Sequence, residues 1–219
     1  MVDYYSDLTD NQKYNIELFL KQAGSSHLDK MKLSYGINSG RTNEAYQRNV
    51  IDALMLNIIP MNVFTNWLSH VNLEGNNHLF VYEPTSNQVF ISNSIELLFE
   101  NVKKKITPIY DINKDSLDEI KIVDICCLSS QQLVFTLAAP SQVHEKNSDT
   151  GEFELQKDIY LSYIIMDFEF KHFVLLMHPT VKLVSIMGEV KERDIDKLTY
   201  IIMHSFKNQV VRFDYQEPD

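Results

Sequence analysis

The longest apolar run in the chain lies between Asp158 and His178, DIYLSYIIMDFEFKHFVLLMH, and it is rich in β-branched and aromatic residues. This composition predicts the centre of a β-sheet. In the middle of the run, Asp167, Glu169 and Lys171 alternate with phenylalanines, so an extended backbone would place the charges on one face and the rings on the other. A strand of this length far exceeds the usual ~5–6 residues, which predicts a bend near 167–171.

The first third of the chain shows apolar positions at helical spacing. Thr9 and Gln12 have the form of a capping box, Gly24 suits a helix end, and Thr42 suits an N-cap. We expect four short helices, over residues 9–24, 28–34, 42–56 and 61–69. Their short connections are typical of a compact helical unit.

After residue 74 the pattern becomes mainly that of strands. We expect a hairpin at 79–82 and 89–91, a helix from Ser94 to about 105, strands at 120–127, 133–139, 182–186 and 210–215, and a helix at 194–206. The polar segment 140–157 is either a mobile loop or a hairpin tip.

Helices followed by strands indicate an α+β fold. We expect an N-terminal four-helix unit at 1–73 and a mainly antiparallel β-sheet domain at 74–219 with two or three inserted helices. One continuous core is the alternative. Because a predicted strand lies close to the last residue, the sequence also leaves open that the chain is a fragment of a longer protein.

Composition supports a globular, intracellular protein. Apolar residues make up 44% and charged residues 23% of the 219 residues. No apolar run reaches the ~18 residues of a membrane span, and the first residues lack the pattern of a secretory signal, so we expect no membrane association. Cys126 and Cys127 are adjacent and are expected as free thiols in a reducing cytoplasm.

The net charge of −10 disfavours nucleic-acid binding spread over the surface, because phosphate neutralisation supplies most of that affinity. Residues 1–60 carry six basic and seven acidic side chains and are nearly neutral. Any contact with nucleic acid is therefore expected in this N-terminal unit.

A first chemical hypothesis concerns Asp158, Glu169 and Lys171. An acid, a spacer and Glu-x-Lys resemble the metal-dependent restriction-endonuclease-like family, although Lys157 stands where that family has a proline before the first acid. The resemblance implies that the two carboxylates hold Mg²⁺ and that the lysine supports the attacking water. The alternative is that the charges form the solvent-exposed apex of a long β-hairpin. No further metal or cofactor site is expected.

A second hypothesis concerns the segment 28–54. Its stretch GINSGRTNEAYQRNVIDAL resembles the SAP motif, a helix-extended-helix element that binds DNA. The resemblance implies phosphate contacts by the four basic residues Lys30, Lys32, Arg41 and Arg48. The alternative is an ordinary helix start, with Glu44 and Arg48 as an exposed i,i+4 pair.

The remaining feature is a cluster of aromatic residues near the boundary between the predicted helices and the predicted strands. We expect most of these rings to form the core between the two units, since such rings bury large areas. If the helical unit packs loosely, part of this surface would meet a partner or a second copy, and the expected interface residues are Phe64, Trp67, Phe80 and Tyr82. The sequence carries no phosphate loop, HExxH, paired CxxC or GxSxG signature. We therefore expect a non-catalytic interaction protein that acts as a subunit of a larger assembly or as a homo-oligomer. A metal-dependent nuclease and a nucleic-acid-binding accessory protein are the alternatives.

Overall fold

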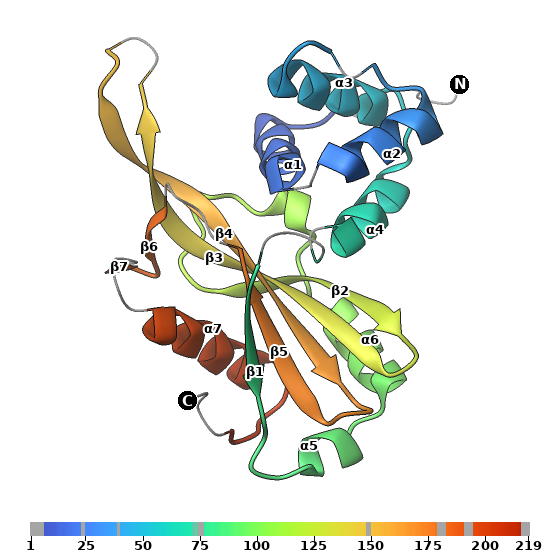
Figure 1. The fold of residues 1–219 in the computed structure, drawn as a ribbon, viewed down its shortest axis with the longest axis vertical. Helices are drawn as coiled ribbons and strands as arrows, with labels where there is room; N and C mark the ends of the chain where they lie inside the picture. The colour runs from blue at the N-terminus through green and yellow to red at the C-terminus, as the bar shows by residue number, and fades with distance from the viewer. Residues whose placement is uncertain are drawn as a thin grey trace. The chain divides into compact units, whose positions relative to one another are not determined.

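The computed structural model describes residues 7–22, 25–38, 40–71, 73, 77–147, 150–178, 183–190 and 195–215. The chain divides into two compact units, one of residues 1–75 with 110–112 and one of residues 76–109 with 113–219. The first is helical and the second is built on an antiparallel sheet, which confirms the predicted α+β class (Figure 1). Among the described residues, no helix combines the length and apolarity that crossing a bilayer requires.

The helical unit contains the four helices that the sequence predicts. They are α1 (Asp10–Gln22), α2 (Ser25–Tyr35), α3 (Asn43–Met55) and α4 (Met61–Val71). The capping box is confirmed, since the Thr9 backbone donates to Gln12 Oε1 and the Gln12 backbone donates to Thr9 Oγ1. Thr42 caps α3 by accepting from the backbone N–H of Ala45. Gly24 lies outside the described residues.

Residues 110–112 join the helical unit through polar side chains of α1, which the sequence did not predict. They overlap the 3₁₀ helix η2 (Ile109–Asp111). The buried Asn15 donates through Nδ2 to the carbonyls of Tyr110 and Ile112, at 3.1 and 2.6 Å. Asn11 donates to the same Ile112 carbonyl at 2.9 Å. These bonds give the backbone carbonyls of Tyr110 and Ile112 hydrogen-bond donors from α1.

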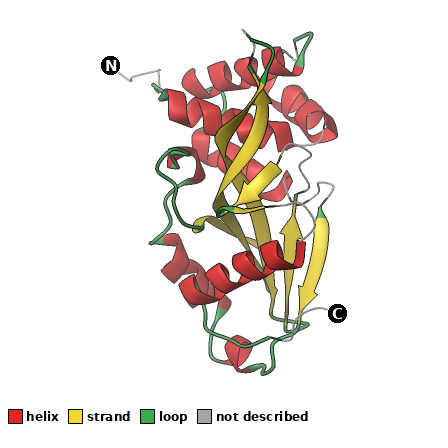
Figure 2. Cartoon of the chain, turned by 90° about the vertical axis from the view of Figure 1, so that its left-hand side faces the viewer, coloured by secondary structure: helices red, strands yellow, loops and turns green. Residues whose placement is uncertain are grey.

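The sheet unit has the strand order β1-β5-β4-β3-β6-β7, with β2 paired to β3. Its strands are β1 (His78–Tyr82), β2 (Lys121–Ser129), β3 (Gln132–Lys146), β4 (Phe153–Asp167), β5 (His172–Met177), β6 (Leu183–Ile186) and β7 (Glu189–Val190). Its helices are α5 (Gln88–Ile91), α6 (Ile95–Lys103) and α7 (Ile195–Gln209). Figure 2 shows β3 and β4 continuing as a narrow ribbon past the other strands.

Two predicted strands are wrong. The segment 89–91 belongs to helix α5, so the expected hairpin does not form and β1 pairs with β5, nearly a hundred residues later in the chain. The segment 210–215 makes only an isolated bridge, between Tyr215 and Pro84. Both segments carry β-prone residues, and Val89, Phe90 and Phe213 are buried, but neither segment joins a strand of the sheet in the described chain.

The core of the sheet unit lies between the sheet and α7. Leu198, Ile202, Met203 and Phe206 of this helix are buried together with residues of β3, β4 and β5. Phenylalanine rings dominate the centre: Phe206 lies edge-on to Phe135 at 4.9 Å, and Phe173 stacks on Phe213 at 4.1 Å between ring centroids.

Candidate interaction surface

The bend expected near 167–171 is a turn that joins β4 to β5. Asp167 ends β4 and is only 3% exposed. Its Oδ1 accepts the backbone N–H groups of Glu169 and Phe170, both at 2.9 Å, and its Oδ2 accepts from Gln132 Nε2 at 2.6 Å. The Asp167 carboxylate therefore closes the turn as a structural acceptor.

The electrostatics of this carboxylate fit that role. Burial raises the pKa of Asp167, but hydrogen bonds from Gln132 and from the backbone of Phe170 and Glu169, with the nearby His172, lower it by more. The pKa of Asp167 therefore lies below its ordinary value.

The other charges of the turn face solvent. Glu169 and Lys171 are exposed, and Phe170 between them is 70% exposed. Lys171 has a φ of 59°, a left-handed conformation that reverses the chain. The charges consequently do not share one strand face, because the backbone from 168 to 171 is not extended.

The structure does not bring the three nuclease-like residues together. Asp158 lies opposite Ser141, nine residues before Asp167 on β4, so about 30 Å of strand separates it from the turn that carries Glu169 and Lys171. In the described residues, no three His, Cys, Asp or Glu side chains come close enough to hold a metal ion. The geometry gives no support to Mg²⁺-dependent chemistry here.

The SAP-like segment forms a helix, a loop and a helix. Lys30, Arg41 and Arg48 are exposed and Lys32 is half-buried. Lys30 and Lys32 are two residues apart on α2 and therefore point to different sides of the helix. The four basic residues thus do not line one helix face.

Glu44 offsets part of the positive charge on α3. The pKa of this carboxyl is lowered by hydrogen bonds from its own backbone and from Thr42, with smaller contributions from Lys21 and Arg48. This arrangement is that of a capped, solvated helix start.

The four aromatic residues expected at an interface are largely buried. Phe64 and Tyr82 are each 1% exposed, and Trp67 and Phe80 are half-buried. Phe64 stacks on Trp67 at 5.9 Å within α4, and Tyr82 packs edge-on to Tyr215 at 5.1 Å in the sheet unit. Phe64 and Tyr82 therefore offer a partner no exposed area, contrary to the expectation.

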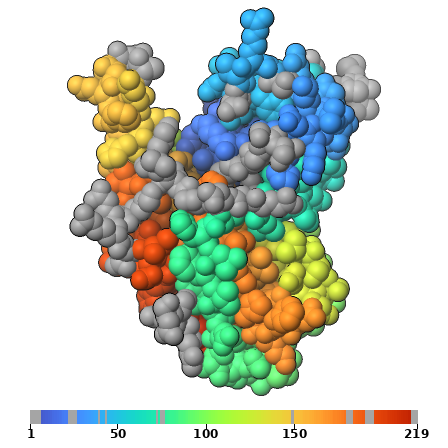
Figure 3. Space-filling model, viewed as in Figure 1, coloured from blue at the N-terminus to red at the C-terminus, as the bar shows by residue number. Residues whose placement is uncertain are grey.

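Exposed apolar side chains occur instead on a hairpin that the sequence left as a loop or hairpin tip. β3 pairs with β4 in unbroken register from Gln132 to Lys146, whereas β6 reaches only Val143 on the other side of β3. We call residues 144–155, beyond that point, the arm. Within the described chain no other strand pairs with the arm, and the space-filling view shows its atoms (gold) projecting from the sheet unit (Figure 3).

The two faces of the arm differ. Phe153 lies opposite Lys146 and Leu155 lies opposite His144, so these four side chains share one face. Phe153 is 69% exposed and Leu155 is 52% exposed. We call this the apolar face of the arm.

The opposite face is acidic. Glu145 lies directly across from Glu154, which places two exposed carboxylates side by side. Asn147 donates to Glu154 Oε1 at 2.7 Å and also holds the tip, since the Gly151 backbone donates to the Asn147 carbonyl. Like charges in direct cross-strand positions destabilise an isolated ribbon.

A sequence signal for the arm was present. Residues 152–156, EFELQ, alternate polar and apolar side chains with the period of two that is typical of a strand with one apolar face. The Ser-Asp-Thr-Gly centre and the many charges nearby favoured a loop, and Pro140 interrupted the preceding strand pattern. The exposure of Phe153 and Leu155 could not be read from the alternation.

Comparison with known proteins yields no relative: no protein-family model, no curated protein and no solved structure matches this chain.

Proposed function

We propose that this chain is a non-catalytic interaction protein, which acts as a subunit of a larger assembly or as a homo-oligomer and docks through the apolar face of the arm. The observation that carries the proposal is the exposure of Phe153 and Leu155 on one face of a two-stranded ribbon. Isolated two-stranded ribbons are marginal in water, and unpaired strand edges invite pairing with another chain. An arm of this kind gains stability when a partner covers it.

A protein partner fits the arm better than nucleic acid. The arm carries one lysine and four acidic residues, a balance that repels phosphate. We also propose that the protein works in the cytoplasm. Cys126 and Cys127 are both free, and a reducing compartment maintains free thiols.

Burial of the apolar face would contribute a moderate free energy of binding. Fully burying a Phe or Leu side chain contributes ~1.5–3 kcal/mol, and more than half of each of these side chains is still exposed. Docking both would therefore contribute ~2–3 kcal/mol, or ~30- to 150-fold in affinity.

The test is a double variant, Phe153→Ser with Leu155→Ser. Sedimentation equilibrium over a concentration series measures self-association, and chemical cross-linking with mass spectrometry locates contacts made by the arm. We expect the wild type to associate through the arm and the variant to associate ~30-fold more weakly.

Leu97→Ser is the matched control, because Leu97 is a similarly exposed apolar residue of the same unit, on α6. It should leave association unchanged. The proposal fails if the double variant associates like the wild type, or if cross-links from assembled protein never include residues 144–155.

A further inference from the structure

A cavity of about 250 Å³ lies at the base of the arm. It forms where β3 changes partner, because β2 pairs with β3 up to Ala138 and β6 begins its pairing at Ser141. Pro140 lies in this gap and has no N–H group to offer to a neighbouring strand. Its carbonyl accepts the backbone N–H of Met187, at 2.9 Å, which brings the β6–β7 turn to the cavity.

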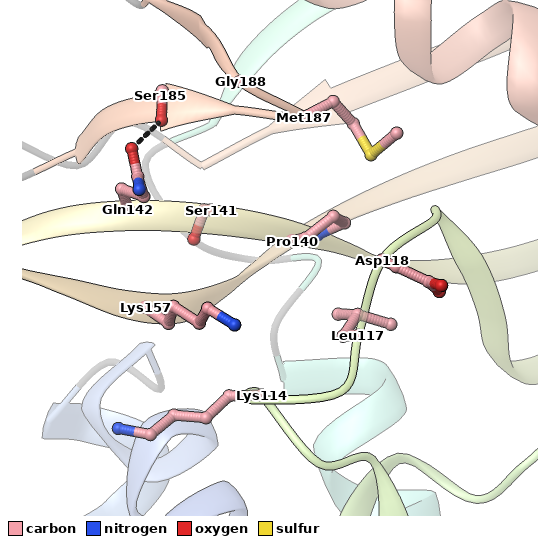
Figure 4. Close-up of a pocket in the computed structure, with 10 residues that line it drawn as sticks. All are labelled: Lys114, Leu117, Asp118, Pro140, Ser141, Gln142, Lys157, Ser185, Met187 and Gly188. Atoms are coloured by element: carbon pink, nitrogen blue, oxygen red, sulfur yellow. Dashed lines mark hydrogen bonds between the residues drawn. The ribbon is translucent and has the colours of Figure 1, made fainter.

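Two residues that carry hydrogen-bond donors lie on neighbouring strands in the wall. Gln142 and Lys157 are cross-strand partners, so their Cβ atoms lie ~5 Å apart on one face. The Oε1 atom of Gln142 accepts from Ser185 Oγ at 3.0 Å, which orients the amide, and Figure 4 shows its nitrogen turned away from Ser185. Within the described chain this nitrogen has no hydrogen-bond partner.

Lys157 supplies a positive charge to the lining. Its Nζ donates one hydrogen bond, to the Asp115 carbonyl at 3.0 Å, and the ammonium has two further donors. Lys114 also lines the cavity, but its side chain extends the opposite way from Lys157 (Figure 4). The lining thus contains two lysines, Lys114 and Lys157, and one acidic residue, Asp118, in a chain of net charge −10.

The rest of the lining is partly apolar. Leu117, Pro140 and Met187 contribute to the walls. Met187 and Gly188 have φ values of 52° and 79°, the two left-handed positions of a tight hairpin turn. A methionine is unusual at such a position, where Asn, Asp or Gly is preferred, and here it presents an exposed apolar side chain at the cavity.

We propose that this cavity binds a small organic anion. Lys157 and the free amide nitrogen of Gln142 hold its oxyanion group, a carboxylate or a phosphate, and Met187, Leu117 and Pro140 cover its apolar part. The volume is below the ~300–1,000 Å³ of sites for drug-sized ligands, which limits the ligand to a small molecule. A charge-assisted hydrogen bond next to a neutral one is a common way to orient such a group.

The test uses three probes on the full chain: benzoate, inorganic phosphate and benzyl alcohol. Backbone amide shifts in ¹H–¹⁵N spectra follow binding at constant ionic strength, because exposed charges are screened by salt. We expect saturable shifts at Ser141, Gln142, Lys157 and Gly188 with benzoate, weaker saturable shifts with phosphate, and none with benzyl alcohol. Stronger binding of phosphate than of benzoate would identify the oxyanion as a phosphate.

Lys157→Met should weaken benzoate and phosphate about tenfold or more, because the charged donor is lost. Met187→Gly should weaken benzoate alone. Lys105→Met is the matched control, since Lys105 is an exposed lysine of the same unit outside the cavity lining and outside the arm, and it should bind like the wild type.

No saturable shift with either anion up to ~20 mM would overturn the proposal, as would unchanged affinity in Lys157→Met. The arm variant Phe153→Ser with Leu155→Ser should bind benzoate normally. Failure of the cavity proposal therefore leaves the docking proposal standing, and failure of the docking proposal leaves the cavity standing.

Discussion

Replacing Asp167 by alanine tests whether the charged turn between β4 and β5 is structural. The carboxylate is buried and accepts three hydrogen bonds, two from the turn backbone and one from the side chain of Gln132. Alanine removes the carboxylate, so the two backbone N–H groups and the Gln132 side chain all lose their acceptor. We expect a marked loss of stability in the sheet unit.

The magnitude follows from those three bonds. A hydrogen bond to an ionised group contributes ~1.5–3 kcal/mol, so three such bonds would contribute ~4.5 kcal/mol even at the lower end of that range. The turn lies at the surface, where water can replace the carboxylate at the two backbone amides. We therefore expect Asp167→Ala to cost ~3 kcal/mol. Asp167→Asn keeps one acceptor oxygen but turns an N–H group toward Gln132, and should cost about half as much.

Hydrogen exchange followed by mass spectrometry measures this loss in peptides from β4 and β5. The single tryptophan, Trp67, lies in α4 and reports on the helical unit, so its fluorescence is not suitable here. A loss of ~3 kcal/mol corresponds to exchange ~100-fold faster for amides that exchange by unfolding of the sheet unit. Glu169→Ala, which removes an exposed carboxylate of the same turn, should change the free energy by less than ~0.5 kcal/mol.

The contribution of Asp167 should also depend on pH. Its pKa is lowered in the folded chain, so the stabilisation is present above the pKa of the unfolded chain and is lost as pH falls through the folded pKa. The difference between wild type and Asp167→Ala should therefore shrink from about pH 6 to about pH 3. A difference below ~0.5 kcal/mol at pH 6, or one that grows on acidification, would refute a structural role for the ionised carboxylate.

Two further predictions concern the loop before α3 and the cysteines. Gly40→Ala should destabilise the helical unit by ~2 kcal/mol in tryptophan-monitored urea unfolding, because φ is +65° and a Cβ would lie 2.6 Å from that of Ala45. Gly36→Ala, with the same φ but open space around the Cβ, should cost only ~1 kcal/mol, and equal losses would contradict the steric argument. Burial, with nearby acidic groups, raises the pKa of the Cys126 thiol to about 12, whereas Cys127 is exposed. Iodoacetamide at pH 8 should alkylate one cysteine per native chain and two after denaturation; two in the native chain would show that Cys126 is accessible.

Much of the local structure was predictable because it depends on neighbouring residues. The capping box of Thr9 and Gln12, the N-caps Thr42 and Ser94, and the bend near 167–171 all arise from short-range backbone hydrogen bonding. Glu169 and Lys171 are exposed at this turn, as the hairpin-apex alternative predicts, whereas Asp167 is buried. The burial of Asp167 was not predicted, because Gln132, which helps to hold it, lies 35 residues away.

The sequence by itself determined the α+β class, the four helices and the positions of most strands, because apolar periodicity and caps act over a few residues. The tertiary structure alone decided which strands pair, which apolar side chains stay exposed and where donors converge. β1 pairs with the distant β5, Tyr82 is buried while Phe153 is not, and Gln142 meets Lys157 at the base of the arm. These outcomes depend on contacts between residues far apart in the chain, and no local pattern encodes whether a given apolar residue finds such a contact.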